Sequence, residues 1–449
     1  MTKPLTRPKR KDPLKKTRVP LLPQGVRSRT ALGLTAAAAE GRFQLQVCAD
    51  CAAVVYPPRD ACPRCLSPRL PFKDVDNRGT LLAETTIRTS TDVYFRERMP
   101  WRIGTVVLDA GPSVVAHLHG DLREGQRTQL QLKLDKSGQA IAIALPAEDT
   151  PNMQDDPQWR ELTCDPKFRR VLITDGRTAV GQALAEALSE AGASIVFVGV
   201  ADPWKPFPGE DSLRKLERVE IVALDMTDTI SVNECAGEFA PRVDILINTA
   251  EHVRTGGIIE RKGLTVAREE LEIRYFGLTR LAQAFGPVLR ARGADGVNSA
   301  AAFVNLLSVY ALANWPAYGA FSATEAACLS AAQSLRAELR PGGVKVVNVF
   351  FGPLETEWYQ AVPPPKVAPS ALARATVRAL QQGVEDVFVG DIAEDIRARL
   401  AVSASSPSRC SATPSVTAAC EISSPRVLSN AASIPLSSAR FASAVGTRG

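Results

Sequence analysis

The sequence predicts a multidomain protein in which a small zinc ribbon and an all-β barrel precede a doubly wound α/β domain. Three observations support this prediction: two Cys-x-x-Cys pairs, a run of five short alternating segments after them, and a long alternation of strands and helices beyond residue 167. A chain of 449 residues is also long enough to bury more than one hydrophobic core.

Composition excludes a membrane-spanning protein. No apolar run approaches the ~18 residues that a spanning helix needs, and no apolar segment follows the basic N-terminal residues as in a secretory signal. With nine cysteines and no export signal, we expect reduced thiols and a cytoplasmic location.

Two terminal segments are predicted to be disordered. Residues 1–26 form a basic, Pro-containing arm, whose alternative role is to lie on an acidic partner or ligand. Residues 401–449 are rich in Ser and Ala and show no periodicity.

The cysteine pairs predict a structural zinc site. Cys48 and Cys51 form one knuckle, and Cys62 and Cys65 form a second, with ten residues between the pairs. Each pair presents two thiolates from a tight turn, and four thiolates complete a tetrahedral zinc site. Because no ligand position stays open, such a site holds a fold together and performs no chemistry.

A small β-barrel is predicted after the ribbon. Period-two segments at residues 79–87, 102–109, 113–119, 129–134 and 139–145 are joined by Gly, Asp and Pro turns, as expected for a barrel of the oligonucleotide/oligosaccharide-binding (OB) type. Residues 147–166 are acidic and aperiodic, which predicts a linker. We therefore place the first module at residues 27–146 and the second at residues 167–400.

The first module resembles the rubredoxin-like zinc-ribbon/OB-fold proteins that accompany thiolase-type enzymes in acyl-CoA metabolism. The resemblance rests on an Ala-rich helix at residues 27–41, the four cysteines, the YPPR sequence at residues 56–59, and Gly79-Thr80 at the start of the barrel. It implies a protein-interaction module that supports a thiolase and contacts its acyl-CoA.

The second module resembles a short-chain dehydrogenase/reductase. Strands and helices alternate from residue 170 to residue 400, and two long helices are predicted at residues 266–291 and 319–339. Such alternation predicts a parallel sheet covered on both faces. The resemblance implies a dinucleotide site at the carboxyl ends of the strands and association of subunits through the two long helices.

The phosphate-binding turn of that family departs from its pattern here. The family sequence Thr-Gly-x-x-x-Gly-x-Gly corresponds to residues 174–181. Asp175 and Ala179 stand at two of the glycine positions, Gly181 is in register, and Gly176 is displaced by one residue. A carboxylate at Asp175 would repel a pyrophosphate at the helix N-terminus.

The other cofactor positions are mixed. Asp225 and Asn248 match residues that contact the cofactor in the family, whereas Glu251 replaces a glycine. Gly199, at the end of the second strand, offers no acceptor to the ribose hydroxyls. We expect at most weak nucleotide binding and no efficient use of NAD(P).

The catalytic positions have lost their chemistry. Ser308 is in place, but Phe321 occupies the position of the family's proton-donating Tyr and Glu325 that of its Lys, and Arg274 replaces an Asn that supports a relay water. Phe has no proton to give, and a carboxylate raises the pKa of a nearby phenol. Tyr318 has no Lys at the right spacing and is not expected to substitute. We predict an ion pair between Arg274 and Glu325.

Three functional hypotheses follow. The favoured one is a non-catalytic scaffold that binds a thiolase-type enzyme through the first module and an intact dehydrogenase subunit through the second. The second is an NAD(P)-dependent oxidoreductase that acts on a 3-hydroxyacyl-CoA. The third, a nucleic-acid-binding protein, is disfavoured because the predicted strands lack aromatic side chains placed to stack on bases.

Overall fold

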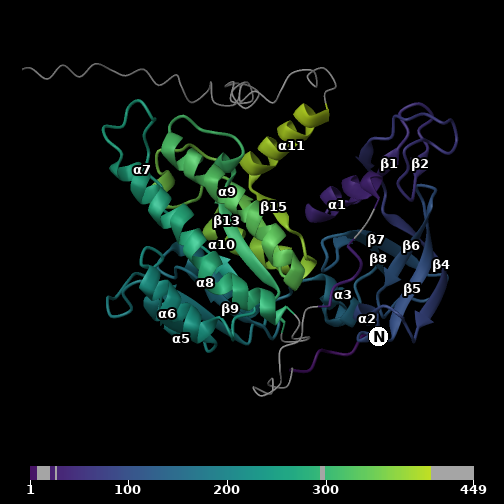
Figure 1. The fold of residues 1–449 in the computed structure, drawn as a ribbon, viewed down its shortest axis with the longest axis horizontal. Helices are drawn as coiled ribbons and strands as arrows, with labels where there is room; N and C mark the ends of the chain where they lie inside the picture. The colour runs from purple at the N-terminus through teal and green to yellow at the C-terminus, as the bar shows by residue number, and fades with distance from the viewer. Residues whose placement is uncertain (8–20, 26–27, 294–298, 406–449) are drawn as a thin grey trace, which may run out of the picture.

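The computed structural model describes residues 1–7, 21–25, 28–293 and 299–405 (Figure 1). Most of the predicted basic arm and all but the start of the predicted C-terminal tail lie outside these residues. The prediction of disorder is wrong for the parts that the structure describes. The Met1 ammonium lies 3.3 Å from Asp121, the Leu5 N–H donates to Asp155 at 3.0 Å, and residues 401–405 continue the last helix, Asp391–Ser405. Figure 1 shows the α/β domain beside the barrel and ribbon, with α1 and α3 on the side of the barrel that faces that domain. No helix of the described residues is long and apolar enough to cross a membrane.

The ribbon is a three-stranded antiparallel sheet with a helix before it. Its elements are η1 (Arg29–Ala31), α1 (Leu32–Ala39), β1 (Gln44–Val47), β2 (Val54–Val55) and β3 (Phe72–Asp74), and β1 is the central strand. Gly41 follows the helix with a φ of +70°, as glycine commonly does past a helix C-terminus. Leu34 and Ala38 of α1 pack into the barrel core, so this helix joins the ribbon to the barrel.

Five strands close the predicted barrel in the order β4-β5-β6-β8-β7. They are β4 (Arg78–Ile87), β5 (Trp101–Leu108), β6 (Ser113–Leu118), β7 (Arg127–Leu134) and β8 (Ala140–Pro146), and α2 (Val93–Arg96) connects β4 to β5. Alternate residues of β6, namely Val114, Ala116 and Leu118, point into the core, as the period of two predicts.

The predicted linker is structured and packs on the barrel. It holds η2 (Met153–Asp155) and α3 (Pro157–Leu162). Trp159 and Leu162 of α3 lie against Ile143 and Leu145 of β8, and Asp156 caps the helix by accepting a hydrogen bond from the Trp159 N–H at 2.9 Å. A helix of six residues is too short to reveal its periodicity in the sequence.

The second domain has the predicted doubly wound architecture, with a seven-stranded parallel sheet in the order β11-β10-β9-β12-β13-β14-β15. The strands are β9 (Arg170–Ile173), β10 (Ile195–Val200), β11 (Val219–Ala223), β12 (Ile245–Asn248), β13 (Ala302–Ser308), β14 (Lys345–Phe351) and β15 (Asp386–Val389). The α-helices are α4 (Ala179–Glu190), α5 (Glu210–Lys215), α6 (Thr229–Phe239), α7 (Thr265–Glu270), α8 (Gly277–Arg292), α9 (Gly319–Leu339), α10 (Pro369–Gln382) and α11 (Asp391–Ser405). Each face of the sheet has its own core: Val171 and Ile173 face one, and Leu172 faces the other.

The helix predicted at residues 266–291 is present and continuous, but the structure adds a feature that the sequence did not reveal. The segment η3 (Leu271–Phe276) between α7 and α8 is a π-helical turn. Such turns add a residue to one turn of a helix and are frequent at functional sites. The turn carries Arg274, whose side chain is buried.

Candidate functional site

The former catalytic positions meet around a buried ion pair. The Arg274 guanidinium comes from η3 and the Glu325 carboxylate from α9, with Nε–Oε1 and Nη2–Oε1 distances of 2.6 and 2.5 Å. Neither side chain is more than 4% exposed. The predicted ion pair is therefore present, in a place where an unpaired charge would be strongly unfavourable.

Backbone groups provide the other hydrogen-bond partners of the Arg274 guanidinium and the Glu325 carboxylate. Arg274 also donates to the carbonyl oxygens of Ala250, just after β12, and of Leu306 in β13, the latter at 3.0 Å. The second oxygen of Glu325 accepts the Ser308 N–H at 2.6 Å. Burial raises the pKa of the Glu325 carboxyl, and the neighbouring guanidinium opposes that shift. The pair thus ties η3 and α9 to the ends of two central strands.

The side chains that the sequence matched to the family's serine and tyrosine positions contact only other parts of the chain. The Ser308 hydroxyl accepts the Tyr310 N–H at 3.3 Å and caps the short turn η5 (Val309–Ala311). Phe321 is buried in a hydrophobic core. Tyr318 directly precedes α9, its ring stacks on Tyr359 at 6.1 Å, and burial raises the pKa of its phenol. A phenol whose pKa is raised is a weaker acid, which is unfavourable for a proton donor.

The sequence did not reveal the roles of Glu251 and Tyr359. Burial, with Glu325 adding to it and Arg274 opposing it, raises the pKa of the Glu251 carboxyl to about 7. Tyr359 lies in the short turn η7 (Glu357–Tyr359), and its ring is fully buried. Its hydroxyl lies close enough to the Glu251 carboxyl to lower the pKa of that group in part, although the two groups form no hydrogen bond of good geometry. The sequence marked Glu251 only as a lost glycine, and Tyr359 reaches the site from beyond β14.

In the turn between β9 and α4, side chains of the turn itself accept hydrogen bonds from its backbone N–H groups. Asp175 pairs with Arg177 at 3.0 Å and accepts the Arg177 backbone N–H at 2.9 Å. Thr178 caps α4 by accepting the Gly181 N–H at 3.0 Å. A Cβ at Gly181 would lie 2.0 Å from the Asp175 carbonyl oxygen, and one at Gly176 would lie 2.0 Å from a β10 side chain. Close packing of the turn accounts for both glycines without a phosphate.

Asn248 and Asp225, the other two residues matched to cofactor contacts, also form hydrogen bonds within the chain. Asn248, at the end of β12, is buried and accepts the Ala250 N–H at 3.2 Å. Asp225 accepts both the N–H and the hydroxyl of Thr227, at 2.9 and 2.7 Å. The residues predicted to contact a dinucleotide therefore stabilise the loops in which they lie, and the turn does not fit a pyrophosphate well.

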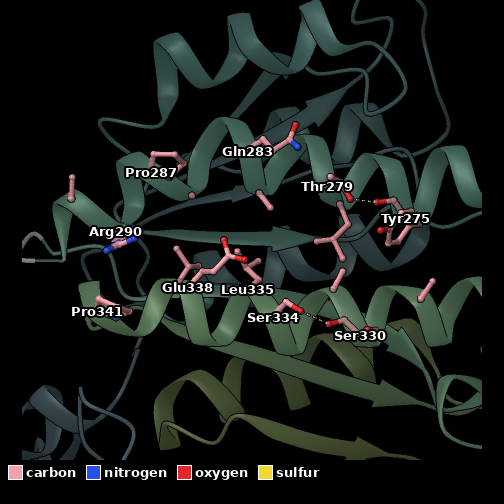
Figure 2. A pocket seen from close by; sticks show the side chains of 17 residues that line it. Tyr275, Thr279, Gln283, Pro287, Arg290, Ser330, Ser334, Leu335, Glu338 and Pro341 are labelled. Atoms are coloured by element: carbon pink, nitrogen blue, oxygen red, sulfur yellow. Dashed lines mark hydrogen bonds between the residues drawn. The ribbon is translucent and has the colours of Figure 1, made fainter. Parts of the chain in front are cut away.

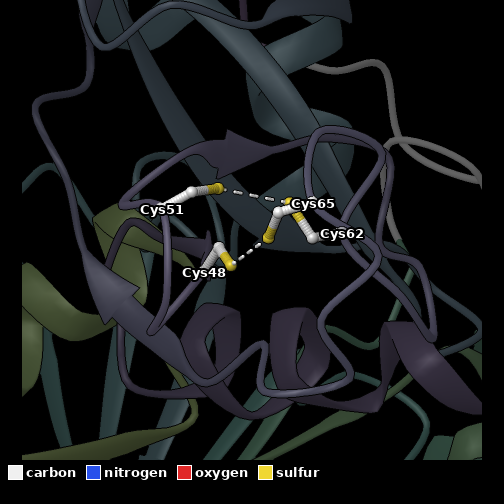
Figure 3. A group of neighbouring side chains, drawn as sticks. All are labelled: Cys48, Cys51, Cys62 and Cys65. Atoms are coloured by element: carbon white, nitrogen blue, oxygen red, sulfur yellow. Dashed lines mark hydrogen bonds between the residues drawn. The ribbon is translucent and has the colours of Figure 1, made fainter.

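The four cysteines of the ribbon form a compact thiol cluster (Figure 3). Their sulfur atoms lie within 4.8 Å of one another, with 3.5 Å between Cys48 and Cys65 and 3.6 Å between Cys51 and Cys62. Sulfurs in a tetrahedral zinc site lie about 3.8 Å apart, given a Zn–S bond of about 2.3 Å. The geometry and the donor set therefore fit a structural zinc ion.

The electrostatics of the cluster also favour a cation. The Cys51 backbone N–H lowers the pKa of the Cys48 thiol to about 6. The pKa of Cys65 is instead raised to about 12, since the neighbouring thiols of Cys51 and Cys48 outweigh the lowering effect of the Ser67 backbone N–H. Four thiolates this close repel one another, and a bound Zn²⁺ removes that cost.

An open groove lies between the two long helices of the second domain (Figure 2). Its volume is about 1110 Å³, and it is lined by α8 and α9 together with Tyr275 and Pro341. Seven of its seventeen lining residues have small side chains, namely Ala282, Gly286, Ala291, Ala327, Ser330, Ala331 and Ser334. Arg290 and Glu338 place one charge of each sign on opposite helices.

Comparison with known families divides the chain in the same way as the fold. Residues 176–410, more than half of the chain, match the model described as enoyl-(acyl carrier protein) reductase. The chain belongs to the short-chain dehydrogenase family. Residues 35–71 match the ChsH2 rubredoxin-like zinc ribbon domain, and residues 72–133 match the ChsH2 C-terminal OB-fold domain. The protein is thus a fusion of a ChsH2-type module with a short-chain dehydrogenase domain, as the sequence predicted.

Individual relatives match the short-chain dehydrogenase domain. Estradiol 17-beta-dehydrogenase 2 of Rattus norvegicus is 30% identical over 197 residues, which cover 42% of this chain and 49% of that protein. The chain therefore spans about half the length of this relative. Short-chain dehydrogenase PC-15 of Penicillium crustosum is 30% identical over 43% of this chain and 68% of its own length. A crystal structure of a Burkholderia cenocepacia short-chain dehydrogenase in complex with NADP is 32% identical over 54% of this chain and 98% of its own, with a TM-score of 0.47.

The zinc assignment predicts that metal analysis of the purified chain will find about one zinc per molecule. Cys48→Ser should lose the metal and unfold the ribbon, because binding of the metal supplies folding free energy to a segment with a small core. Cys235→Ser is the matched control, since this buried cysteine lies in α6 of the other domain. A metal-free protein with an intact ribbon would contradict the assignment.

The buried ion pair predicts strong coupling between two substitutions. Arg274→Met alone or Glu325→Leu alone should lower the free energy of unfolding by about 3–5 kcal/mol, because each leaves one buried charge unpaired. The double variant should recover much of that loss. Arg399→Ala, which breaks an exposed pair with Asp395 at 2.8 Å within α11, should cost less than about 1 kcal/mol. Urea denaturation measures all four values, and additive effects of the two buried substitutions would contradict the coupling.

Proposed function

We propose that this protein is a non-catalytic scaffold for acyl-CoA metabolism. The observation that carries the proposal is the buried Arg274–Glu325 pair, which stands at the positions of the relay Asn and the catalytic Lys of the family. Phe321, at the position of the proton donor, is buried beside it without an ionisable group. Hydride transfer to a carbonyl needs a nearby proton donor of suitable pKa, and these residues supply none.

The groove between α8 and α9 supports a subunit partner for the dehydrogenase domain. Small side chains on both helices allow a second pair of helices to approach closely. Arg290 and Glu338 offer charges of opposite sign to a partner that presents an equivalent surface. The partner we propose is an intact short-chain dehydrogenase subunit. The resemblance of the first module supports a thiolase-type enzyme as its second partner, with an acyl-CoA passing between the two.

An active oxidoreductase is the alternative. Membership of the short-chain dehydrogenase family and the dehydrogenase names of its relatives favour it. Against it stand the self-paired turn at Asp175 and Arg177 and the absence of a proton donor. Fold alone does not decide activity.

Nucleotide titration separates the two functions. The scaffold predicts that the purified chain leaves NADH and NADPH fluorescence unchanged up to millimolar concentrations and does not turn over a 3-hydroxyacyl-CoA. Because Asp175 still occupies the phosphate turn, a variant that combines Phe321→Tyr, Glu325→Lys and Arg274→Asn should fold without two adjacent buried cations and should also remain inactive. Micromolar binding of either nucleotide together with turnover would establish the oxidoreductase instead.

Co-expression tests the partner. An intact short-chain dehydrogenase from the same organism should form a stable hetero-oligomer with this chain, measured by light scattering after gel filtration. Ala331→Arg fills the groove and should reduce the affinity at least tenfold, which corresponds to about 1.4 kcal/mol. Gln333→Arg is the control, because this exposed residue of α9 lies outside the groove lining and on another face of the helix. Assembly that survives Ala331→Arg would exclude this surface.

A further inference from the structure

We infer that the ChsH2-type module and the short-chain dehydrogenase domain form one rigid body, locked at their junction by Lys133 and Lys345. Domains within a chain ordinarily move relative to each other unless a large interface holds them. Here the junction is built from buried charges and backbone groups drawn from both domains and from the segment between them.

Lys345 is the centre of the junction. It begins β14, its side chain is buried, and its ammonium group donates three hydrogen bonds. The acceptors are the carbonyl oxygens of Leu134 at 3.0 Å, Leu162 at 2.9 Å and Gly383 at 3.3 Å. These belong to the end of β7 in the barrel, the end of α3, and the residue after α10. An ammonium has three N–H donors, and each donor of Lys345 binds a carbonyl oxygen in a different part of the chain.

Lys133 adds a second link from the barrel. Its ammonium donates to the Gln382 carbonyl oxygen at the end of α10 at 2.6 Å and lies 5.0 Å from the centre of the Trp159 ring. Burial, with a smaller contribution from Lys345, lowers the pKa of Lys133 to about 7. Two lysines therefore reach from opposite sides of the junction to neighbouring carbonyl groups at the end of one helix.

The charges of the junction are balanced from the dehydrogenase side. Glu385 is buried close to Lys345 and lies 3.3 Å from the Arg336 guanidinium of α9. Burial raises the pKa of Glu385, and Arg336 and Lys345 oppose the shift. Arg336 also pairs with Asp386 at 2.6 Å, at the start of β15. The lysines thus enter a site where acidic groups and carbonyl oxygens replace the water that they lose.

Direct backbone contacts surround these charges. The Glu385 N–H donates to the Ala39 carbonyl oxygen at the end of α1 at 2.8 Å, and the Cys164 N–H donates to the Leu380 carbonyl oxygen at 2.9 Å. A Cβ at Gly383 would lie only 2.5 Å from the Leu162 carbonyl oxygen. Helix α1, which precedes the zinc ribbon, is therefore hydrogen-bonded to Glu385 of the dehydrogenase domain. Opening the junction would break all of these bonds together.

Rigidity has a consequence that rests on the proposed function. Partners bound to the ribbon module and to the groove between α8 and α9 would keep one fixed separation and orientation. The distance and direction from the active site of one bound enzyme to that of the other would then be constant. The rigidity itself concerns the chain alone and does not depend on the identity of any partner.

Hydrogen exchange of the full chain without partners tests the inference. Lys345→Met keeps the length of the side chain and removes its three donors. We expect amide exchange to accelerate at least tenfold in both residues 127–134 and residues 380–386, and the single thermal transition of the wild type to split into two. Lys215→Met, at the exposed end of α5, should change neither. Unchanged exchange in Lys345→Met would overturn the inference.

The wild-type chain provides a second measurement if Lys345→Met does not fold. One rigid body requires a single calorimetric transition in which β7 and β14 lose protection together. Two separate transitions in the wild type would overturn the inference. Because no partner is present, failure here leaves the scaffold function untouched, and failure of the nucleotide or co-expression tests leaves the rigid junction untouched.

Discussion

The dehydrogenase domain depends on how it neutralises one buried guanidinium. Arg274 has left water completely, so its charge must be matched by hydrogen-bond acceptors of fixed position. Glu325 and two strand-end carbonyl groups provide them, and the π-helical turn η3 carries the Arg side chain that reaches them. The same arrangement supports the proposed non-catalytic role. A carboxylate at Glu325 stabilises the neutral form of any nearby phenol, where a Lys would stabilise its anion.

The other altered positions follow the same logic. Polar groups that would face a ligand in an enzyme of this family here hydrogen-bond to the chain itself. Asp175 holds Arg177, Asn248 holds the turn after β12, and Asp225 holds Thr227. A dinucleotide would have to displace these contacts as well as overcome the charge of Asp175. These internal hydrogen bonds stabilise the loops around the sheet edge without a ligand.

Sequence patterns predicted the parts of this structure that depend on local periodicity or on a fixed spacing. The five barrel strands, the seven parallel strands and the cysteine cluster follow from such signals, and the Arg274–Glu325 pair followed from the positions of the family motif. The π-helical turn and α3 were missed because each is too short to alter a periodic pattern. Tyr359 and Lys345 were missed for another reason. Their partners lie far away in the sequence, 211 residues away for Leu134, and only the assembled fold brings them together.

The junction between the modules fixes the position of the dehydrogenase domain relative to the zinc ribbon. Burying an ammonium such as that of Lys345 is costly unless hydrogen-bond acceptors replace the water that it loses, and those acceptors exist only when the two modules are in contact. Here three carbonyl groups from separate segments converge on that ammonium. The groove between α8 and α9 therefore has a fixed position relative to the zinc ribbon. A fixed distance between two binding surfaces is a property that only the fused chain provides, and it requires no catalytic residue.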